Sequence, residues 1–596
     1  MTLTKKTRNG NLRLKSLTLG FFAICLAFIA KLFIIQVLDH QQYKALADEQ
    51  YWNFQQIPAK RGNILSSDGF LLASTQTYYL MYAEPKTITN PNKVSDDLAS
   101  KLADLHPIQN KTKDEAYVFY KNKIMAALDT NLMWVILEHS ISPIEKDQLT
   151  ALKIAGIGFQ DEPVRYYPEG TLLSHVLGYV AGDENGTKRG YFGIEGYLDG
   201  DLQGHPGRIL QEQDALGNPI LIGGHKTTEA INGRNIVLTI DRSVQYLIEK
   251  QLKTAVDKYD ALAGTVIVMN PQTGDVIAMA NYPTYDPSDF SDFSDPQQST
   301  DSEVRKKVER IDSAVSETYE PGSVIKPLTI SAAVENKIVT PETTYHDDGP
   351  VKYSDYYIDN WDHKHWGELN IIQLLQKSNN IGAAWVGTQV GPQRLSDYFR
   401  KFGLGEKTGI ELEGEDTGVI RDPKTWTDID TATASFGQGI SATPLQVLNA
   451  FNVFANDGKL MKPRIVSKIV DEGKEIDIPV KEVRQVITEQ TNKTMVDLLV
   501  QAVNGGESKY FNLKDYIIAG KTGTAQIPVN GQYDPDKTNA TFVGFLPGND
   551  KFSMIVRLNT PRASIFAAET AVPLWMTIAD ELTKYYGIPP DKVTQD

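Results

Sequence analysis

Three short segments of this chain combine residue types that could carry out acyl-transfer chemistry, and the first contains Ser323 and Lys326. An apolar run at residues 328–334 predicts a helix, and Pro327 fits only in its first turn because proline lacks a backbone N–H. Ser323 is therefore expected at the helix N-terminus, with the Lys326 amine on the same face and within reach of its hydroxyl. A desolvated lysine could take the proton of that hydroxyl and make the oxygen a nucleophile. Alone, the pair is weak evidence, because a capping serine beside a solvated lysine is the commoner arrangement.

The second segment is Ser378-Asn379-Asn380, which lies between two apolar stretches. Ser378 could relay a proton, and Asn380 could form a hydrogen bond with an amide of a substrate. Polar residues between apolar stretches are usually a loop or a helix cap, so this signal is also weak by itself.

The third segment is Lys521-Thr522-Gly523-Thr524. With Gly520 before it, this segment gives a Gly-Lys-Thr triplet that suggests a phosphate-binding loop. That motif needs a glycine where Asp515 stands, and strand-like residues flank the triplet on both sides. On an edge strand, Gly523 would instead let another backbone approach closely. Lys521 and Thr524 would then offer a positive charge and a hydroxyl to a carboxylate.

The composition limits what these segments can belong to. The 596 residues include 60 basic and 75 acidic side chains, a net charge of −15, and 41% of the residues are apolar. This balance is typical of a folded protein and argues against a general nucleic-acid binder. Cys25 is the one cysteine, so the chain has neither an intrachain disulfide framework nor a cysteine-pair metal site. His363 and His365 beside Asp362 form only a weak set of zinc ligands.

The N-terminus predicts a membrane anchor. Residues 1–16 contain five basic and no acidic side chains, and the apolar stretch 17–38 is interrupted only by Lys31. At about 1.5 Å per residue these 22 residues span a hydrocarbon core of about 30 Å, and the basic flank is expected in the cytoplasm. A cleaved signal peptide is the alternative, with a small-residue site at 45–47. The apolar stretch is longer than a signal peptide needs, and residues 39–42 separate it from that site.

Residues 39–235 are expected to form a pedestal, because no residue set in them looks catalytic. A Ser-Ser-Asp-Gly turn at 66–69 predicts a hairpin, and residues 98–105 and 121–128 have helical spacing.

Residues 236–590 are expected to form one large α/β domain. Asp241 is a plausible N-cap for a helix that ends at about Tyr259. The other predicted elements are strands at 236–240, in 264–281, at 516–526 and in 541–558, and a closing helix at 567–586. Strands at both ends of the block suggest that its first and last segments share a sheet.

Together, the three segments form a more specific pattern than any one of them. Ser323-x-x-Lys326, Ser378-x-Asn380 and Lys521-Thr522-Gly523 resemble the active-site set of penicillin-binding proteins and serine β-lactamases. The sequences YEPGSVIKP, ASFGQGISATPLQ and AGKTGTAQ narrow the resemblance to the monofunctional class B penicillin-binding proteins. RGNILSSDGFLLA, RYYPEGTLLSHVLGYV and GYFGIEGYLDGDLQGHPG resemble the pedestal segments of that class. The resemblance extends from the anchor to about Tyr586.

The resemblance implies a multidomain α+β or α/β protein. A cytoplasmic tail (1–16) and a single transmembrane helix (17–38) would precede an elongated mixed pedestal or dimerisation domain (39–235). A transpeptidase domain (236–590) with a central antiparallel sheet flanked by helices would follow. The protein would be a single-pass protein of the cytoplasmic membrane, with its N-terminus in the cytoplasm and its catalytic domain outside.

The implied activity is that of a D,D-transpeptidase that cross-links peptidoglycan stem peptides through an acyl-enzyme. The implied catalytic residues are the nucleophile Ser323, the base Lys326 and the proton relay Ser378. The implied substrate-binding residues are Asn380, Lys521, Thr522, Gly523 and Thr524. Backbone N–H groups of Ser323 and Thr524 would form the oxyanion hole. β-Lactams would acylate Ser323, and the reaction would need no metal or cofactor.

The resemblance also implies partners and leaves alternatives open. A polytopic glycosyltransferase is expected as a partner, together with other proteins of a division or elongation complex, and the pedestal sequences favour division slightly. The alternatives are a D,D-carboxypeptidase, a β-lactamase, a β-lactam sensor and a catalytically weak scaffold. The anchor and pedestal disfavour a β-lactamase, and the single span disfavours a sensor. Asn379 departs from the serine that is commoner in the family, and residues 435–439 match the family with no chemical role beyond close backbone packing by their glycines.

Overall fold

The computed structural model describes residues 6–44, 52–108, 111–129, 132–182, 188–212, 225–289, 312–511, 513, 515–529 and 531–591. They form two compact units. The first comprises Met1–Lys60 and Gly204–Asn232, and the second comprises Arg61–Gln203 and Gly233–Asp596.

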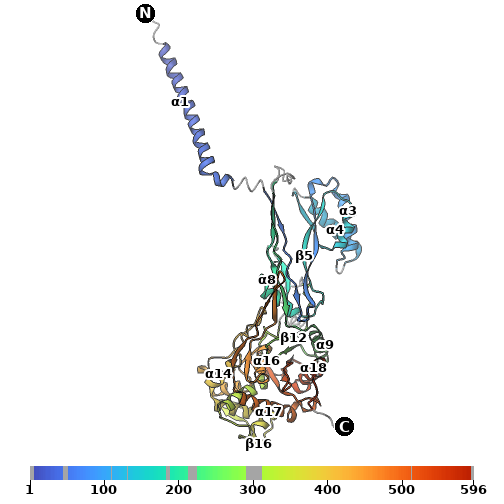
Figure 1. The fold of residues 1–596 in the computed structure, drawn as a ribbon, viewed down its shortest axis with the longest axis vertical. Helices are drawn as coiled ribbons and strands as arrows, with labels where there is room; N and C mark the ends of the chain where they lie inside the picture. Colours follow the sequence, from blue (N-terminus) through green and yellow to red (C-terminus); the bar gives the residue numbers. More distant parts are fainter. Residues whose placement is uncertain are drawn as a thin grey trace. The chain divides into compact units, whose positions relative to one another are not determined.

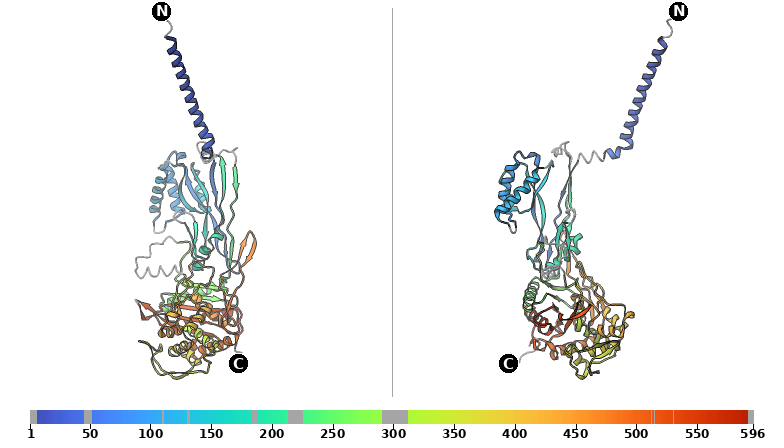
Figure 2. Two further views of the ribbon diagram at one scale, coloured as in Figure 1. Left: turned by 90° about the vertical axis from the view of Figure 1, so that its left-hand side faces the viewer. Right: turned by 180° about the vertical axis from the view of Figure 1, so that it is seen from behind.

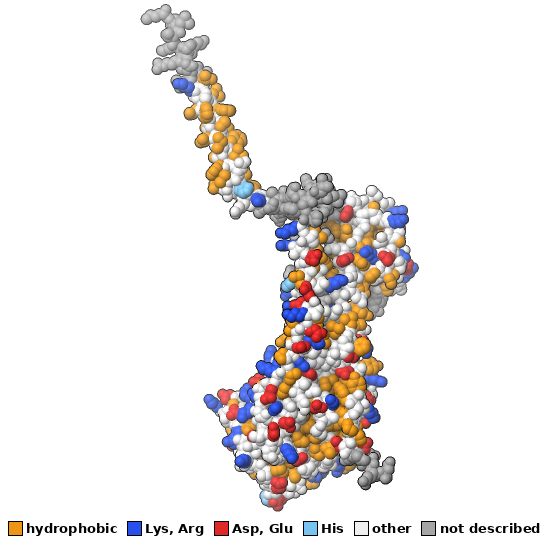
Figure 3. Space-filling view, in the orientation of Figure 1, with side chains coloured by type: hydrophobic (Ala, Val, Ile, Leu, Met, Phe, Trp, Pro, Cys, Tyr) orange, Lys and Arg blue, Asp and Glu red, His pale blue; other side chains and the backbone are white. Residues whose placement is uncertain are grey.

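The first unit contains the predicted apolar helix. Helix α1 (Lys6–Phe33) continues as the π-helical turn η1 (Ile34–Leu38). Residues Leu14–Leu38 are long and apolar enough to cross a membrane, with a mean hydropathy of 2.5 and no buried share. Apolar side chains cover this helix in the space-filling view (Figure 3). The alternative cleavage site at 45–47 lies outside the described residues.

The first unit also contains a small antiparallel sheet. Its strands are β1 (Trp52–Ile57), β8 (Gly207–Glu212) and β9 (His225–Thr228), in the order β1-β8-β9.

The second unit contains the predicted hairpin and both predicted pedestal helices. Strands β2 (Ile64–Leu65) and β3 (Leu71–Ala83) pair antiparallel around a turn in which the Ser66 N–H donates to the Phe70 carbonyl at 2.9 Å. Helices α3 (Pro91–Leu105) and α4 (Lys113–Leu128) begin earlier than their apolar spacing indicated. The side chains of Asn90 and Thr112 cap them.

The pedestal sheet crosses the boundary that the sequence predicted at residue 235. The remaining strands of this sheet are β4 (Val135–Ile141), β5 (Ile157–Tyr166), β10 (Asn235–Leu238), β18 (Val466–Asp471) and β19 (Lys474–Asp477). The order is β19-β18-β10-β2-β3-β4, and β5 also pairs with β3. The strand predicted at 236–240 therefore pairs with β2 and with β18, about 230 residues away in sequence. The predicted domain bounds stay a prediction, but this sheet ties the two segments together.

A five-stranded antiparallel sheet organises the C-terminal block. Its strands are β11 (Ala263–Met269), β12 (Val276–Tyr282), β21 (Ala519–Val529), β22 (Gln532–Phe545) and β23 (Ser553–Asn559), in the order β12-β11-β23-β22-β21. The prediction that the first and last segments share a sheet is confirmed for the strands of 264–281, because β11 pairs with β23 along its whole length. It is wrong for the strand predicted at 236–240, which belongs to the pedestal sheet. Strand β21, which contains Lys521, is an edge strand.

Helices cover both faces of this sheet (Figures 1 and 2). Helices α9 (Arg242–Tyr259, capped by Asp241) and α18 (Ala571–Tyr585) pack on one face around the fully buried Trp575. The other face joins a larger helical core. Its helices are α11 (Lys326–Glu335), α12 (Ile371–Lys377), α13 (Asn380–Val390), α14 (Pro392–Lys401), α15 (Asp428–Ala434), α16 (Pro444–Ala455) and α17 (Glu489–Gly505).

Short elements connect these parts. The helical ones are α5 (Pro143–Thr150), α6 (Ser174–Leu177), α7 (Gly193–Tyr197), α8 (Asp199–Gln203) and the 3₁₀ turns η2 (Pro85–Thr87), η3 (Gly322–Ile325), η4 (Pro423–Thr425), η5 (Glu507–Phe511) and η6 (Ala567–Glu569). The strands pair as β6 (Tyr179–Gly182) with β7 (Lys188–Tyr191), β13 (Thr344–Asp347) with β16 (Gly367–Asn370), β14 (Val351–Tyr353) with β15 (Tyr356–Ile358), and β17 (Lys459–Met461) with β20 (Glu482–Gln485).

Candidate active site

Ser323 lies in the turn η3, directly before α11, as its sequence context predicts. Its side chain is partly exposed, whereas the turn residues around it are buried. Pro327 occupies the first turn of α11, where a backbone N–H would have no partner within the helix, so its lack of an N–H costs no hydrogen bond.

Lys326, at the start of α11, is fully buried and joins the first segment to the second. Its Nζ lies within hydrogen-bond distance of the Ser378 carbonyl oxygen (2.5 Å), Ser378 Oγ (3.3 Å) and Asn380 Oδ1 (2.8 Å). Among the described residues, no hydrogen bond joins Lys326 Nζ to the Ser323 hydroxyl, which was its expected partner. Catalytic hydrogen bonds often form only when substrate is bound, so Lys326 stays a candidate base.

Lys521, near the start of the edge strand β21, joins the third segment to the same serine. Its Nζ donates to Ser378 Oγ at 3.0 Å and to Thr522 Oγ1 at 3.1 Å. Ser378 Oγ therefore lies between two buried amines, a position from which a hydroxyl can pass a proton.

The two amines do not have the same proton affinity. Burial lowers the pKa of Lys326 well below its usual value, and the neighbouring charge of Lys521 lowers it further. Burial also lowers the pKa of Lys521, to about 8. The negative charge of Glu507 opposes both shifts. Both amines are therefore easier to deprotonate than an ordinary lysine, and the charge of Lys521 adds to this effect at Lys326.

The loop that carries Ser378 is fixed by buried polar contacts. Ser378 ends α12 with a left-handed backbone, at φ 52°. Asn379 caps α13 through the Gly382 N–H, and its Nδ2 donates to the fully buried Asp347 at 2.7 Å. The departure from the family at Asn379 therefore has a structural role, because its amide anchors the loop to Asp347.

Asn380 is also fixed by its neighbours. Its Nδ2 donates to the Asp359 carbonyl at 3.1 Å, and its backbone N–H donates to Asn360 Oδ1 at 3.0 Å. Its Oδ1 already accepts from Lys326. The amide therefore orients the candidate base.

Gly523 lets another backbone segment approach closely. That segment is the turn η3 of this chain, which contains Ser323 and is called the nucleophile turn below. A Cβ at this position would lie 2.9 Å from the Pro321 carbonyl oxygen and 3.0 Å from a methyl carbon of Val324. A Cβ on Gly322 would likewise touch Ala525. The residues between these contacts are Ser323 and Thr524, whose backbone N–H groups were expected to form the oxyanion hole. Thr524 itself is exposed.

Residues 435–439 brace the nucleophile turn from the other side. The Gly322 N–H donates to the Gly437 carbonyl at 3.0 Å, and the Gly439 N–H donates to Glu320 Oε1 at 3.0 Å. A Cβ on Gly437, where φ is 83°, would lie 2.2 Å from the Gly322 oxygen. The role of this segment is therefore close backbone support for the turn, and glycine is required because of both the contact and the φ angle.

Two acidic residues of the site were missed by sequence reasoning. Glu507 accepts a hydrogen bond from Thr522 Oγ1 at 3.3 Å, and Asp347 holds the 378–380 loop. Neither belongs to a motif, and only their contacts in space reveal them.

The suggested zinc ligands contact carboxylates, one in their own loop and one at the end of β13. His363 Nδ1 lies 2.8 Å from Asp359, and His365 Nδ1 lies 3.3 Å from Asp347. Within the described ranges, no group of three or more His, Cys, Asp or Glu side chains is placed to hold a metal ion.

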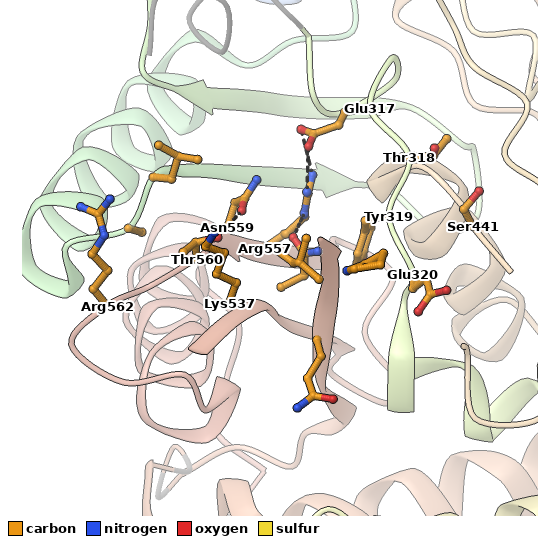
Figure 4. A pocket seen from close by; sticks show the side chains of 16 residues that line it. Glu317, Thr318, Tyr319, Glu320, Ser441, Lys537, Arg557, Asn559, Thr560 and Arg562 are labelled. Carbon is orange, nitrogen blue, oxygen red and sulfur yellow. Dashed lines mark hydrogen bonds and ion pairs between the residues drawn. The ribbon is translucent and has the colours of Figure 1, made fainter. Parts of the chain in front are cut away.

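A cavity of about 970 Å³ is lined by residues other than the candidate catalytic groups (Figure 4). The end of β21 and residues 318–320 form part of its wall. Arg557 is buried in this wall, where Glu317 binds it at 3.1 Å and the Tyr319 ring lies 4.5 Å from it. None of the predicted site residues lines this cavity.

Two models of known protein families match this sequence. The model of the penicillin binding protein transpeptidase domain matches residues 264–576, and that of the penicillin-binding protein dimerisation domain matches residues 56–238.

Individual proteins match over most of the chain. The peptidoglycan D,D-transpeptidase FtsI of Buchnera aphidicola subsp. Baizongia pistaciae is 31% identical over 89% of this chain and 88% of its own length. Stage V sporulation protein D of Bacillus subtilis is 29% identical over 98% of this chain and 88% of its own length. The crystal structure of penicillin binding protein 2X from Streptococcus thermophilus superposes with a TM-score of 0.72 at 24% identity, over 91% of this chain and 83% of that one.

Proposed function

The chain belongs to the penicillin-binding protein transpeptidase family, and on that premise we propose that Ser323 is its acylated nucleophile. The protein is a serine-type peptidoglycan D,D-transpeptidase. The single observation that supports the residue assignment is the hydrogen-bonded series Lys326–Ser378–Lys521, with the fully buried Lys326 three residues after Ser323.

Acylation uses Ser323 and Lys326. The Ser323 oxygen attacks the carbonyl carbon between the two terminal D-alanines of a stem peptide, and neutral Lys326 takes the hydroxyl proton. The backbone N–H groups of Ser323 and Thr524 stabilise the oxyanion. The C–N bond then breaks, and the proton passes from Lys326 through Ser378 to the nitrogen of the leaving D-alanine.

Substrate recognition uses the edge strand and the 378–380 loop. Protonated Lys521 and the hydroxyls of Thr522 and Thr524 bind the terminal carboxylate, while Gly523 keeps the strand close to the nucleophile turn. Asn380 binds an amide of the peptide. An amine of a second stem peptide then attacks the carbonyl carbon of the acyl-enzyme. The new C–N bond forms the cross-link, the ester C–O bond to Ser323 breaks, and the proton of the amine passes to the Ser323 oxygen.

β-Lactams acylate the same serine, because their strained amide presents a carbonyl and a carboxylate to the same groups. The catalytic scheme needs only the side chains and backbone groups named, so we propose no metal or cofactor.

The helix Leu14–Leu38 supports a single-pass anchor in the cytoplasmic membrane. The five basic side chains of residues 1–16 support a cytoplasmic N-terminus and an extracytoplasmic catalytic domain. We propose a polytopic glycosyltransferase as a partner that supplies glycan strands, within a division or elongation complex.

The test is the partition of products from a donor peptide that ends in D-Ala-D-Ala, with and without an amine acceptor. Mass spectrometry of the products is expected to show D-alanine release and a cross-linked peptide with the wild type, and neither with Ser323→Ala. Hydrolysis without cross-linking at saturating acceptor would indicate a carboxypeptidase. Absence of both products would indicate a scaffold.

A further inference from the structure

Glu507 is an acidic residue at the edge of the active site to which the catalytic scheme gives no role. It begins the turn η5, between α17 and β21, and its side chain is half-buried. Its Oε2 accepts from Thr522 Oγ1 at 3.3 Å, and the same Thr522 oxygen accepts from Lys521 Nζ at 3.1 Å. The Thr522 hydroxyl therefore connects the carboxylate of Glu507 to the ammonium of Lys521.

Glu507 also places a negative charge near the two buried lysine amines. Both lysines of the site are buried, and their hydrogen bonds go to uncharged oxygens of Ser378, Asn380 and Thr522. Among the described residues, Glu507 is the one acidic residue whose charge raises the pKa of both amines, against the effect of burial. A buried cation without a nearby anion loses its proton readily.

We propose that Glu507 is a positioning residue that keeps Lys521 protonated beside a neutral Lys326, and that the carboxylate of the substrate replaces it at Thr522. This inference rests on the proposed function, because it assigns Lys521 the binding of that carboxylate. Two carboxylates cannot both use the Thr522 hydroxyl without strong repulsion, so Glu507 acts in the free enzyme and withdraws when substrate binds.

The inference predicts a direction for the pH dependence. Acylation requires Lys326 without its proton, which sets the acidic limb of the profile, and Lys521 with its proton, which sets the alkaline limb. Removing the negative charge of Glu507 lowers the pKa of both amines. Both limbs therefore move to lower pH, by roughly one unit if the charge acts as other close charges in proteins do. A purely structural role would lower the rate without moving the limbs together.

The experiment measures the second-order rate of acylation by benzylpenicillin between pH 5.5 and 9.5. It compares the full-length wild type with Glu507→Gln and with Asp497→Asn, which removes an exposed acidic charge from α17. Glu507→Gln is expected to shift both limbs to lower pH, and Asp497→Asn is expected to match the wild type. Unchanged limbs in Glu507→Gln, or a shift to higher pH, would overturn the inference.

A second variant, Glu507→Asp, tests the inference even if Glu507→Gln does not fold. It retains the negative charge but moves it one methylene further from Thr522. The two limbs of its pH profile are therefore expected between those of the wild type and those of the glutamine variant. Limbs that coincide with the wild type in both variants would overturn the inference. A wild-type enzyme that benzylpenicillin does not acylate would instead refute the proposed function itself.

Discussion

Lys521 sets an upper pH limit on the reaction with substrates that carry a carboxylate. Burial lowers the pKa of its amine from 10.5 to about 8, and only the protonated form attracts a carboxylate. With that pKa, about 90% of the amine is protonated at pH 7 and about 10% at pH 9. The second-order rate of acylation by benzylpenicillin is therefore expected to fall about tenfold between these values.

The assay is stopped-flow acylation of the full-length protein, with Lys521→Arg as the test variant. A guanidinium keeps its charge above pH 12, so the alkaline limb is expected to disappear in this variant. Its absolute rate should fall, because the larger group does not reproduce the contacts of Lys521 Nζ with Ser378 and Thr522. Lys493→Arg, an exposed position on α17, is the matched control and should keep the wild-type limb.

Two results would refute this reasoning. A wild-type rate that stays constant up to pH 9.5 would show that the charge of Lys521 does not limit acylation. An alkaline limb that persists unchanged in Lys521→Arg would show that another group titrates there.

Three further predictions concern the base, the support of the turn and the pedestal. Lys326→Ala should slow penicillin acylation by about 10²–10⁴-fold, the usual contribution of a general base, and near-normal kinetics would contradict its role. Gly437→Ala places a Cβ against the Gly322 oxygen and adds about 1–2 kcal/mol of left-handed backbone strain, so acylation should slow and the melting temperature should fall by several degrees. In the pedestal, the buried carboxylate of Glu195 binds two buried arginines, Arg61 at 2.5 Å and Arg165 at 2.6 Å. Glu195→Ala removes this shared partner and should cost about 3–5 kcal/mol in urea unfolding; a loss below about 1 kcal/mol would show that the ion pairs of Glu195 are unimportant.

Much of the site could be predicted because its residues stand in short, ordered segments. The position of Ser323 before a helix followed from Pro327 and the apolar run after it, and the structure places it there. The meeting of Lys326 with the 378–380 loop and with Lys521 followed only from the family resemblance. Periodicity cannot bring together Lys326 and Ser378, which are 52 positions apart, or Ser378 and Lys521, which are 143 positions apart.

The remaining features depend on contacts that no local pattern encodes. Strand β10 has the same apolar alternation whether it joins the sheet of β11 or that of β2 and β18, so its partners were not predictable. The expected bond between Lys326 and Ser323 is absent because Ser378 and Asn380 satisfy the amine instead. Glu507 escaped notice because its role arises from the fold of η5 against Thr522, 15 residues away.

The identity of the acylated residue tests the central claim most directly. The full-length protein is incubated with a fluorescent penicillin, and the intact mass and a peptide map are measured for the wild type and for Ser323→Ala. The catalytic scheme predicts one penicilloyl group per wild-type chain, on the peptide that contains Ser323, and none on the variant. An unlabelled wild type, or a label that persists in Ser323→Ala, would contradict it.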